Sequence, residues 1–378
     1  MNIRHIFLVK LVICILGLLP LGSARAGTYG TDPTTPTAAQ EEARKESTAS
    51  TQTSRAATQQ TVSIIGSRIT AILSPSRMAP SGGSGGGATP SGSSKKSTSV
   101  LPGATQSTAG AALVTSGYSA GDETLSRAAW VSYNHSWVRS DWDEIKSSST
   151  IHTGVFGADM KLDDRFLVGL SGVVLSTGSN NSFNDGFADG KGYAIVPYGA
   201  LSLLDGTVVI EAMTGFGQGS SDVRRNVSVF PISYKSDSDR WLASTAVTYN
   251  HALDKLSLSA KLGWMMAYEW THGYTDSLGN AVGSQISRLG EASIGGRAAY
   301  TFDGLEPYFG VTVVYDPLLT PDGVGLSGNR LDRKEVTGTL GFNWMPDDGI
   351  IAGMEASNGF FRERQGNTTV SASLRIAF

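Results

Sequence analysis

The chain has almost no cysteine, little net charge and no long apolar run. Its single cysteine, Cys14, lies within the first 26 residues, so the remainder has no disulfide and no thiol chemistry. A formal net charge of −3 over 378 residues is too small to indicate strong attraction to nucleic acid. No apolar stretch reaches the roughly 20 residues that a spanning helix needs. Membrane β-barrels are not excluded, because their strands alternate apolar and polar residues.

The first 26 residues have the features of a signal peptide. Two basic residues precede an apolar segment over 11–21, and Ala24-Arg25-Ala26 fits the A-x-A cleavage pattern. The apolar segment is too short for a membrane anchor and contains Pro20. We therefore predict export through the inner membrane, with a cleavage site formed by Ala24 and Ala26.

Three segments of different composition follow. Residues 27–54 are rich in Thr, Ala, Ser, Glu and Pro and are predicted to be a disordered, passenger-like segment. Residues 55–75 carry apolar residues at helical spacing, including Ile65 and Ile69, which predicts an amphipathic helix that ends before Pro75. Residues 76–125 are rich in Gly and Ser and are typical of a flexible linker.

From residue 126 onward, apolar and polar residues alternate in twelve segments. We predict strands at 127–138, 149–162, 165–176, 190–203, 207–217, 239–252, 255–270, 286–302, 305–316, 332–344, 349–359 and 368–378. Tight turns alternate with longer loops, which are expected at 139–148, 177–189, 218–238, 271–285, 317–331 and 360–367. Short turns on one side and longer loops on the other are typical of outer-membrane barrels whose chain ends lie in the periplasm.

One face of these strands is apolar along its whole length. In the seventh segment every second residue from Leu256 to Trp270 is apolar, and the charged residues lie on the opposite face. Aromatic residues gather at both ends of the apolar face, with Trp137 at the loop end and Phe378 at the turn end. Two such belts are expected at the two membrane interfaces, so the pattern favours a membrane barrel over a soluble β-sandwich.

Several short segments occur in a fixed order: 157–171, Arg240-Trp-Leu-Ala-Ser244, Tyr274-Thr-Asp-Ser-Leu-Gly279, Pro307-Tyr-Phe-Gly310 and the closing Ala372-Ser-Leu-Arg-Ile-Ala-Phe378. In this order, residues 126–378 resemble the translocator domain of the autotransporter family. The resemblance implies an all-β, twelve-stranded antiparallel transmembrane barrel, a helix in its lumen and export of an N-terminal passenger. It also implies assembly by the outer-membrane barrel-assembly machinery, which would read the last strand at Leu374, Ile376 and Phe378.

Two features depart from the family pattern. The segment before the predicted helix is too short to hold a folded passenger domain. No Asn occurs from residue 27 through 133, which excludes the release of a passenger by an Asn that attacks its own backbone, as in some members. We therefore expect a barrel that anchors, and translocates or displays, a very short N-terminal segment. The alternative is an outer-membrane pore, or a barrel that displays only its own loops.

Ionisable residues on the inward strand faces are predicted to line the lumen: Glu211, Glu269, Glu291, Arg297, Glu306, Glu355 and Arg375. Two interpretations remain open. These residues grip a helix plug through Arg68, next to Ile65 and Ile69, or they pair with one another and with water. The linker is also long enough for the helix to remain outside the barrel.

His135 and His152 face each other on the lipid side if the first hairpin closes symmetrically around its loop. We interpret them as interfacial residues, and the alternative is a lipid hydrolase built on the barrel wall. No cluster has metal-ligand spacing, so no catalytic residue, metal or cofactor is predicted. The expected protein is a monomer of the outer membrane and not an enzyme. Its expected partners are membrane lipid and the assembly machinery, without nucleic acid.

Overall fold

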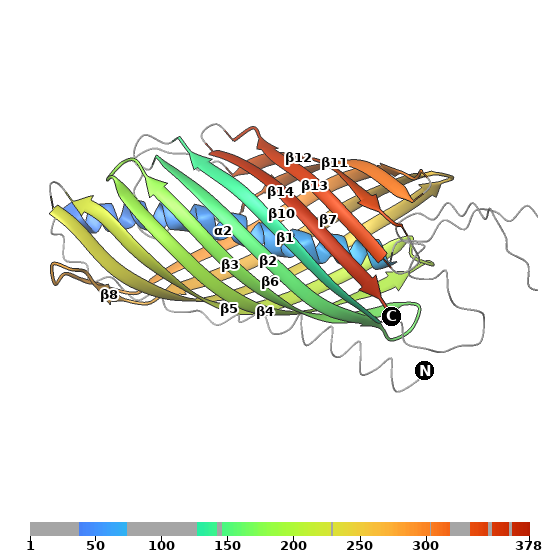
Figure 1. Ribbon diagram of the computed structural model, residues 1–378, viewed down its shortest axis with the longest axis horizontal. Helices are drawn as coiled ribbons and strands as arrows, with labels where there is room; N and C mark the ends of the chain where they lie inside the picture. Colours follow the sequence, from blue (N-terminus) through green and yellow to red (C-terminus); the bar gives the residue numbers. More distant parts are fainter. Residues whose placement is uncertain are drawn as a thin grey trace, which may run out of the picture.

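The strands close into one antiparallel barrel of twelve strands (Figure 1), which confirms the predicted fold class. The structure is a computed structural model. It describes residues 38–73, 127–141, 146–227, 230–302, 304–317, 333–346, 350–362 and 365–378. The predicted cleavage site at Ala24 and Ala26 and the predicted linker over 76–125 lie outside these residues. Strand β1 (Arg127–Ser140) pairs with β14 (Gln365–Ala377) and closes the barrel.

Every other strand of the barrel pairs with its neighbours in sequence. These strands are β2 (Ser147–Lys161), β3 (Phe166–Asn181), β4 (Gly186–Leu203), β5 (Val208–Val227), β6 (Phe230–Leu253), β7 (Leu256–Thr271), β10 (Gln285–Tyr300), β11 (Leu305–Tyr315), β12 (Lys334–Trp344) and β13 (Ile350–Phe360). A separate short pair, β8 (Tyr274–Thr275) and β9 (Ala281–Val282), forms in the connection between β7 and β10.

Two of the predicted loops are wrong. The regions 177–189 and 218–238 are mostly strand, and the β5–β6 ladder continues to the pair Val227 and Phe230. Beyond the apolar belt both faces of a strand meet water, so the period-two alternation of hydropathy disappears. The backbone N–H and C=O groups still require partners, and the ladder supplies them. The connection between β5 and β6 is therefore only residues 228–229.

At the opposite end the connections whose residues the structure describes are as tight as predicted: β2–β3, β4–β5 and β6–β7. The β6–β7 turn contains Asp254 with a φ of +51°, a left-handed conformation that Asp tolerates better than most residues. The β10–β11 turn contains Gly304 with a φ of +86°, and a Cβ atom there would lie 2.8 Å from the Met345 carbonyl oxygen. Glycine is needed at this position for both reasons.

Helix α2 (Ala38–Leu73) begins earlier than predicted. Disorder was expected over 27–54, and that expectation is wrong from Ala38 onward. The chain from 38 to 65 contains no Pro or Gly and many Ala, Gln, Glu and Arg residues, which favour helix. The helix ends two residues before Pro75, because proline disfavours helical backbone in the residue that precedes it. In the described part of the chain no helix has the length and apolar content to cross a membrane.

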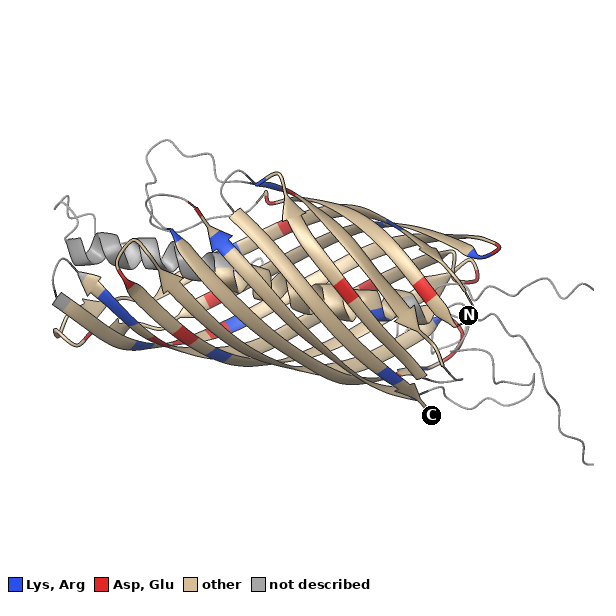
Figure 2. Ribbon diagram, turned by 45° about the horizontal axis from the view of Figure 1, so that its top comes forward, with Lys and Arg blue, Asp and Glu red and all other residues tan. Residues whose placement is uncertain are grey.

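Large apolar side chains cover the outside of the barrel. Charged residues occur as isolated positions on strands that are otherwise uncharged (Figure 2). Many of the apolar side chains are more than half exposed, a fraction that a water-facing sheet would not tolerate over so large an area. Examples from different strands are Phe156, Leu170, Ile195, Leu262, Phe309 and Leu340.

Candidate functional site

Helix α2 lies inside the barrel and runs along its axis (Figure 1). Contacts at two points establish its direction. Thr53 Oγ1 lies 3.0 Å from Ser149 Oγ, at the loop end of β2. Further along the helix, Arg68 binds Asp159, at the turn end of the same strand. The helix therefore runs from the loop end of the barrel to the turn end, where β1 begins and β14 ends.

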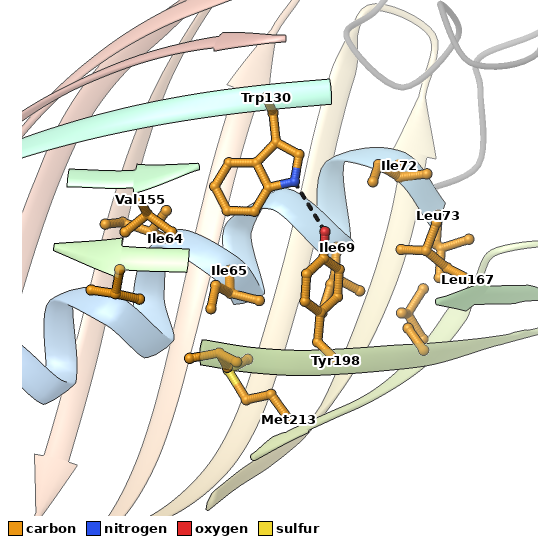
Figure 3. Packing of buried hydrophobic residues seen from close by; sticks show 14 residues of the cluster. Ile64, Ile65, Ile69, Ile72, Leu73, Trp130, Val155, Leu167, Tyr198 and Met213 are labelled. Carbon is orange, nitrogen blue, oxygen red and sulfur yellow. Dashed lines mark hydrogen bonds between the residues drawn. The ribbon is translucent and has the colours of Figure 1, made fainter. Parts of the chain in front are cut away.

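One side of the helix packs against an apolar surface formed by β1–β5 (Figure 3). Ile65 and Ile69 are 0% exposed, and Ile72 is 2% exposed. Burying such a side chain is worth about 1.5–3 kcal/mol. The lumen of an outer-membrane barrel is usually polar, so this surface is unusual. We call its inward residues the apolar wall: Trp130, Val155, Leu167, Val196, Val209 and Met213.

At the turn end, Arg68 forms a two-pronged ion pair with a carboxylate of the barrel. Its Nε lies 3.1 Å from Asp159 Oδ2, and its Nη2 lies 2.9 Å from Oδ1. The Tyr198 hydroxyl donates to Asp159 Oδ2 at 3.1 Å. Trp130 Nε1 in turn donates to the Tyr198 hydroxyl at 3.0 Å, as Figure 3 shows. We call these four residues the inner clamp. Both charges are buried, and several hydrogen bonds satisfy the carboxylate.

One of the two interpretations of the sequence placed Arg68 against lumen carboxylates, but Asp159 was not among the carboxylates predicted. A signal was present, because Asp159 alternates with the outward-facing Phe156 and Ala158 on β2 and therefore faces inward. Alternation identifies the face of a strand on which a residue lies. It does not identify the neighbour across the lumen, and only the closed barrel supplies that.

Near the loop end, Arg55 of the helix lies among buried carboxylates. Its Nη2 is within 4.0 Å of carboxylate oxygens of Asp316, Glu291 and Glu335. Arg362 Nε also lies 2.8 Å from Glu335 Oε2, and Arg362 Nη2 lies 3.3 Å from Asp316 Oδ2. We call these five residues the outer charge cluster. Only Glu291 was predicted to line the lumen, because the others meet only when separate connections converge at the loop end.

Three of the predicted lumen carboxylates approach the helix directly. Gln59 Nε2 donates to Glu291 Oε2 at 2.5 Å, and Ser54 Oγ donates to Glu269. Glu211, which pairs with Lys261, lies against Gly66. A Cβ atom on Gly66 would lie 2.8 Å from Glu211 Oε1. The absence of a side chain at Gly66 lets the helix come this close.

The other predicted acids pair with barrel residues. Arg297 Nη2 and Asn343 Nδ2 lie 3.1 and 3.0 Å from Glu306 Oε1, and the Tyr308 hydroxyl donates to Glu355 at 2.9 Å. We call this network on β10–β13 the charged wall: Arg297, Glu306, Tyr308, Asn343 and Glu355. The two interpretations of the ionisable residues therefore each describe one part of the lumen.

The remaining predicted residues lie on β14 or, in the case of Phe378, directly after it. Arg375 faces inward, is 4% exposed and interacts electrostatically with Arg68 and Asp159. Leu374, Ile376 and Phe378 lie on the outer face and are 41%, 48% and 74% exposed. The Phe378 N–H donates to the Arg127 carbonyl oxygen at 2.9 Å, so the ladder between the first and last strands continues to the final residue.

Comparisons with known proteins agree with this architecture. The chain is similar to the translocator domain of the autotransporter NalP from Neisseria meningitidis, with a TM-score of 0.57 and 11% identity over 68% of this chain and 89% of that chain. It is also similar to the beta domain of the Bordetella autotransporter Brka, with a TM-score of 0.54 and 11% identity over 66% and 98% of the respective chains. These likenesses concern the fold alone.

A search of curated proteins finds no significant match. The family model described as "Autotransporter beta-domain" matches residues 129–357, which is more than half of the chain. Barrels of this family reside in the outer membrane. The chain therefore belongs to the autotransporter beta-domain family, and its barrel is an outer-membrane barrel.

Proposed function

We propose that this protein anchors a short N-terminal segment in the outer membrane and displays it at the cell surface. The direction of α2 carries the proposal. The helix starts at the loop end of the barrel and finishes at the turn end. Outer-membrane barrels keep their short turns in the periplasm and their longer loops outside. Residues 27–37, which precede the helix, then leave the barrel on its outer side.

The contacts of the helix favour a resident plug over an open pore. If the helix left the lumen, the apolar wall would meet water, and Asp159 would lose its charged partner. Exposed apolar surface costs about 25 cal/mol per Å², so loss of the helix is unfavourable even though water would then solvate Asp159. A helix held in this way anchors whatever chain precedes it.

Export and assembly complete the proposed role. A signal peptide cleaved after Ala26 takes the chain across the inner membrane, and the assembly machinery recognises Leu374, Ile376 and Phe378 on the outer face of β14. The mature protein is then a monomer surrounded by outer-membrane lipid. Its role is display rather than catalysis, without a nucleic-acid partner.

Surface display of the N-terminal segment can be tested with variants that carry one introduced cysteine. Cys14 is the chain's only cysteine and leaves with the proposed signal peptide, so no native thiol interferes. In intact cells, a membrane-impermeant maleimide is expected to label Thr31→Cys, before the helix, and Ser277→Cys, in an outer connection. Ser93→Cys, between the helix and β1, is expected to react only after the outer membrane is permeabilised. Labelling of residue 277 without residue 31 would reject display and favour a barrel that presents only its loops.

A further inference from the structure

Two histidines on the outside of the barrel have no role in the display of the N-terminal segment. His135 on β1 and His152 on β2 are directly opposite in the strand register, as the sequence predicted. Their Nδ1 atoms lie 3.1 Å apart. The Tyr133 hydroxyl, on the same outward face, lies 2.7 Å from His152 Nδ1. Two imidazole nitrogens and one hydroxyl oxygen thus lie close together on the outer surface of the barrel.

Hydrogen bonding alone satisfies this arrangement poorly. A neutral imidazole nitrogen carries either one proton or one lone pair. His152 Nδ1 therefore cannot form a full hydrogen bond with both His135 Nδ1 and the Tyr133 hydroxyl. A cation between the two rings would instead use the lone pairs of both nitrogens. Neutral imidazoles are good ligands for zinc, copper and nickel.

The distance between the two nitrogens fits such an ion. Zinc–nitrogen bonds of 2.0–2.1 Å at a tetrahedral angle place two ligand nitrogens roughly 3.3 Å apart. The observed 3.1 Å therefore requires only a small adjustment of the rings. The Trp137 ring packs edge-on against His135 at a centroid distance of 4.1 Å, which limits rotation of that imidazole.

The surroundings can also accommodate the charge. Trp137 is two residues closer to the loop end than His135 and belongs to the aromatic belt at that membrane interface. The imidazoles lie two residues inside this belt, but His152 is directly opposite the exposed Ser176, so the pair lies at the edge of the apolar surface, next to the end of the barrel that meets water. No group of three or more His, Cys, Asp or Glu residues that could hold a metal occurs among the described residues. A site here would thus have two protein ligands and open positions.

We propose that His135 Nδ1 and His152 Nδ1 bind a divalent transition-metal ion of the zinc class, and that the Tyr133 hydroxyl, which then no longer bonds to His152 Nδ1, donates to a water molecule on the ion. Water molecules fill the remaining coordination positions. The site is independent of the helix and of the display proposed above, because it lies on the opposite face of the β1–β2 hairpin.

Isothermal titration calorimetry of Zn²⁺ binding tests the proposal. The untagged mature protein is used in detergent micelles. The wild type is expected to bind one Zn²⁺ per chain, and His135→Ala/His152→Ala is expected to lose this binding. The matched control His251→Ala/His272→Ala removes two histidines elsewhere on the barrel and is expected to retain it. Equal loss in both variants, or a wild type that binds no more zinc than the first variant, would overturn the proposal.

A spectroscopic measurement on the unmodified protein does not depend on the folding of any variant. With one equivalent of Cu²⁺, the electron paramagnetic resonance spectrum is expected to show coupling to two imidazole nitrogens. Coupling to none, or the spectrum of hydrated copper, would contradict the site. The characteristic gel shift of a folded barrel on boiling shows which histidine variants are comparable with the wild type.

Discussion

The apolar wall and the charged wall occupy opposite arcs of one barrel, yet they depend on the helix to different degrees. The apolar wall comes from β1–β5 and is buried by the isoleucines of α2. The charged wall comes from β10–β13, and its groups pair with one another. If the helix were removed, water could solvate the polar pairs of the charged wall. The apolar side chains of the apolar wall would be exposed to water. The charged wall itself therefore does not need the helix, although on the same side of the barrel Arg55 of the helix belongs to the outer charge cluster.

The largest expected effect comes from placing charge against the apolar wall. Ile65→Asp/Ile69→Asp would bury two carboxylates without partners, at a cost of several kcal/mol each. We expect the helix to leave the lumen, the temperature of the boiling gel shift to fall and single-channel conductance to rise. Ser63→Asp/Ser67→Asp adds the same charges at the same spacing on the exposed side of the helix. Equal behaviour of the two variants would disprove the role of the apolar wall.

A smaller loss is expected at the inner clamp. Arg68→Met removes the ion-pair partner of the buried Asp159 and leaves it only the electrostatic interaction with Arg375, so it should lower the free energy of unfolding in liposomes by up to about 3–5 kcal/mol. The double variant Arg68→Met/Asp159→Asn removes both charges and should recover most of this loss, because Tyr198 can still donate to the Asn side-chain oxygen. No recovery in urea titrations of the double variant would show that the ion pair is not the cause.

Close approach of the helix to the barrel predicts a cost at Gly66. Leucine there would meet Glu211 and Lys261, and overpacking of this kind costs about 1–3 kcal/mol. The loss should occur although Leu favours helix more than Gly. Ser67→Leu, at the next and exposed position, is the control and should be close to neutral in the same urea titration.

The smallest effect is expected on the charged wall. Arg297→Met removes a partly exposed arginine, while Glu306 keeps its hydrogen bond from Asn343. The expected loss in the free energy of unfolding is about 1 kcal/mol, at the upper end for exposed ion pairs, because Arg297 is partly exposed whereas Glu306 is buried. A loss as large as that of Arg68→Met would remove the distinction between the two walls.

The barrel could be predicted from the sequence because membrane strands display their alternation directly. Leu256 to Trp270 alternate over the whole length of β7, and the observed strand has nearly the predicted limits. The alternation of apolar and polar residues failed to predict strands where β5 and β6 extend beyond the apolar belt. Both faces of these strands meet water there, so hydropathy no longer distinguishes one face from the other. It also failed before residue 55, where many Thr and Ser residues concealed a continuous helix from Ala38.

The lumen could be predicted only in part. Alternation placed Glu211, Glu269 and Glu291 on inward faces, where the structure has them near the helix. It gave no information on which inward residues meet across the barrel. Asp316 and Arg362 come together only when the ring is closed and the connections after β11 and β13 converge. Contacts of this kind depend on three-dimensional closure, so no local pattern predicts them.

The apolar wall is built from five consecutive strands, so the helix can enter the lumen before the barrel is closed. The docking surface of α2 is complete once β5 has formed, seven strands before the ring is sealed by β14. A curved, unfinished sheet can accept the helix from its open side, so the polypeptide need not be pulled through a finished hole. Closure of the seam between first and last strands would then trap a helix that is already seated.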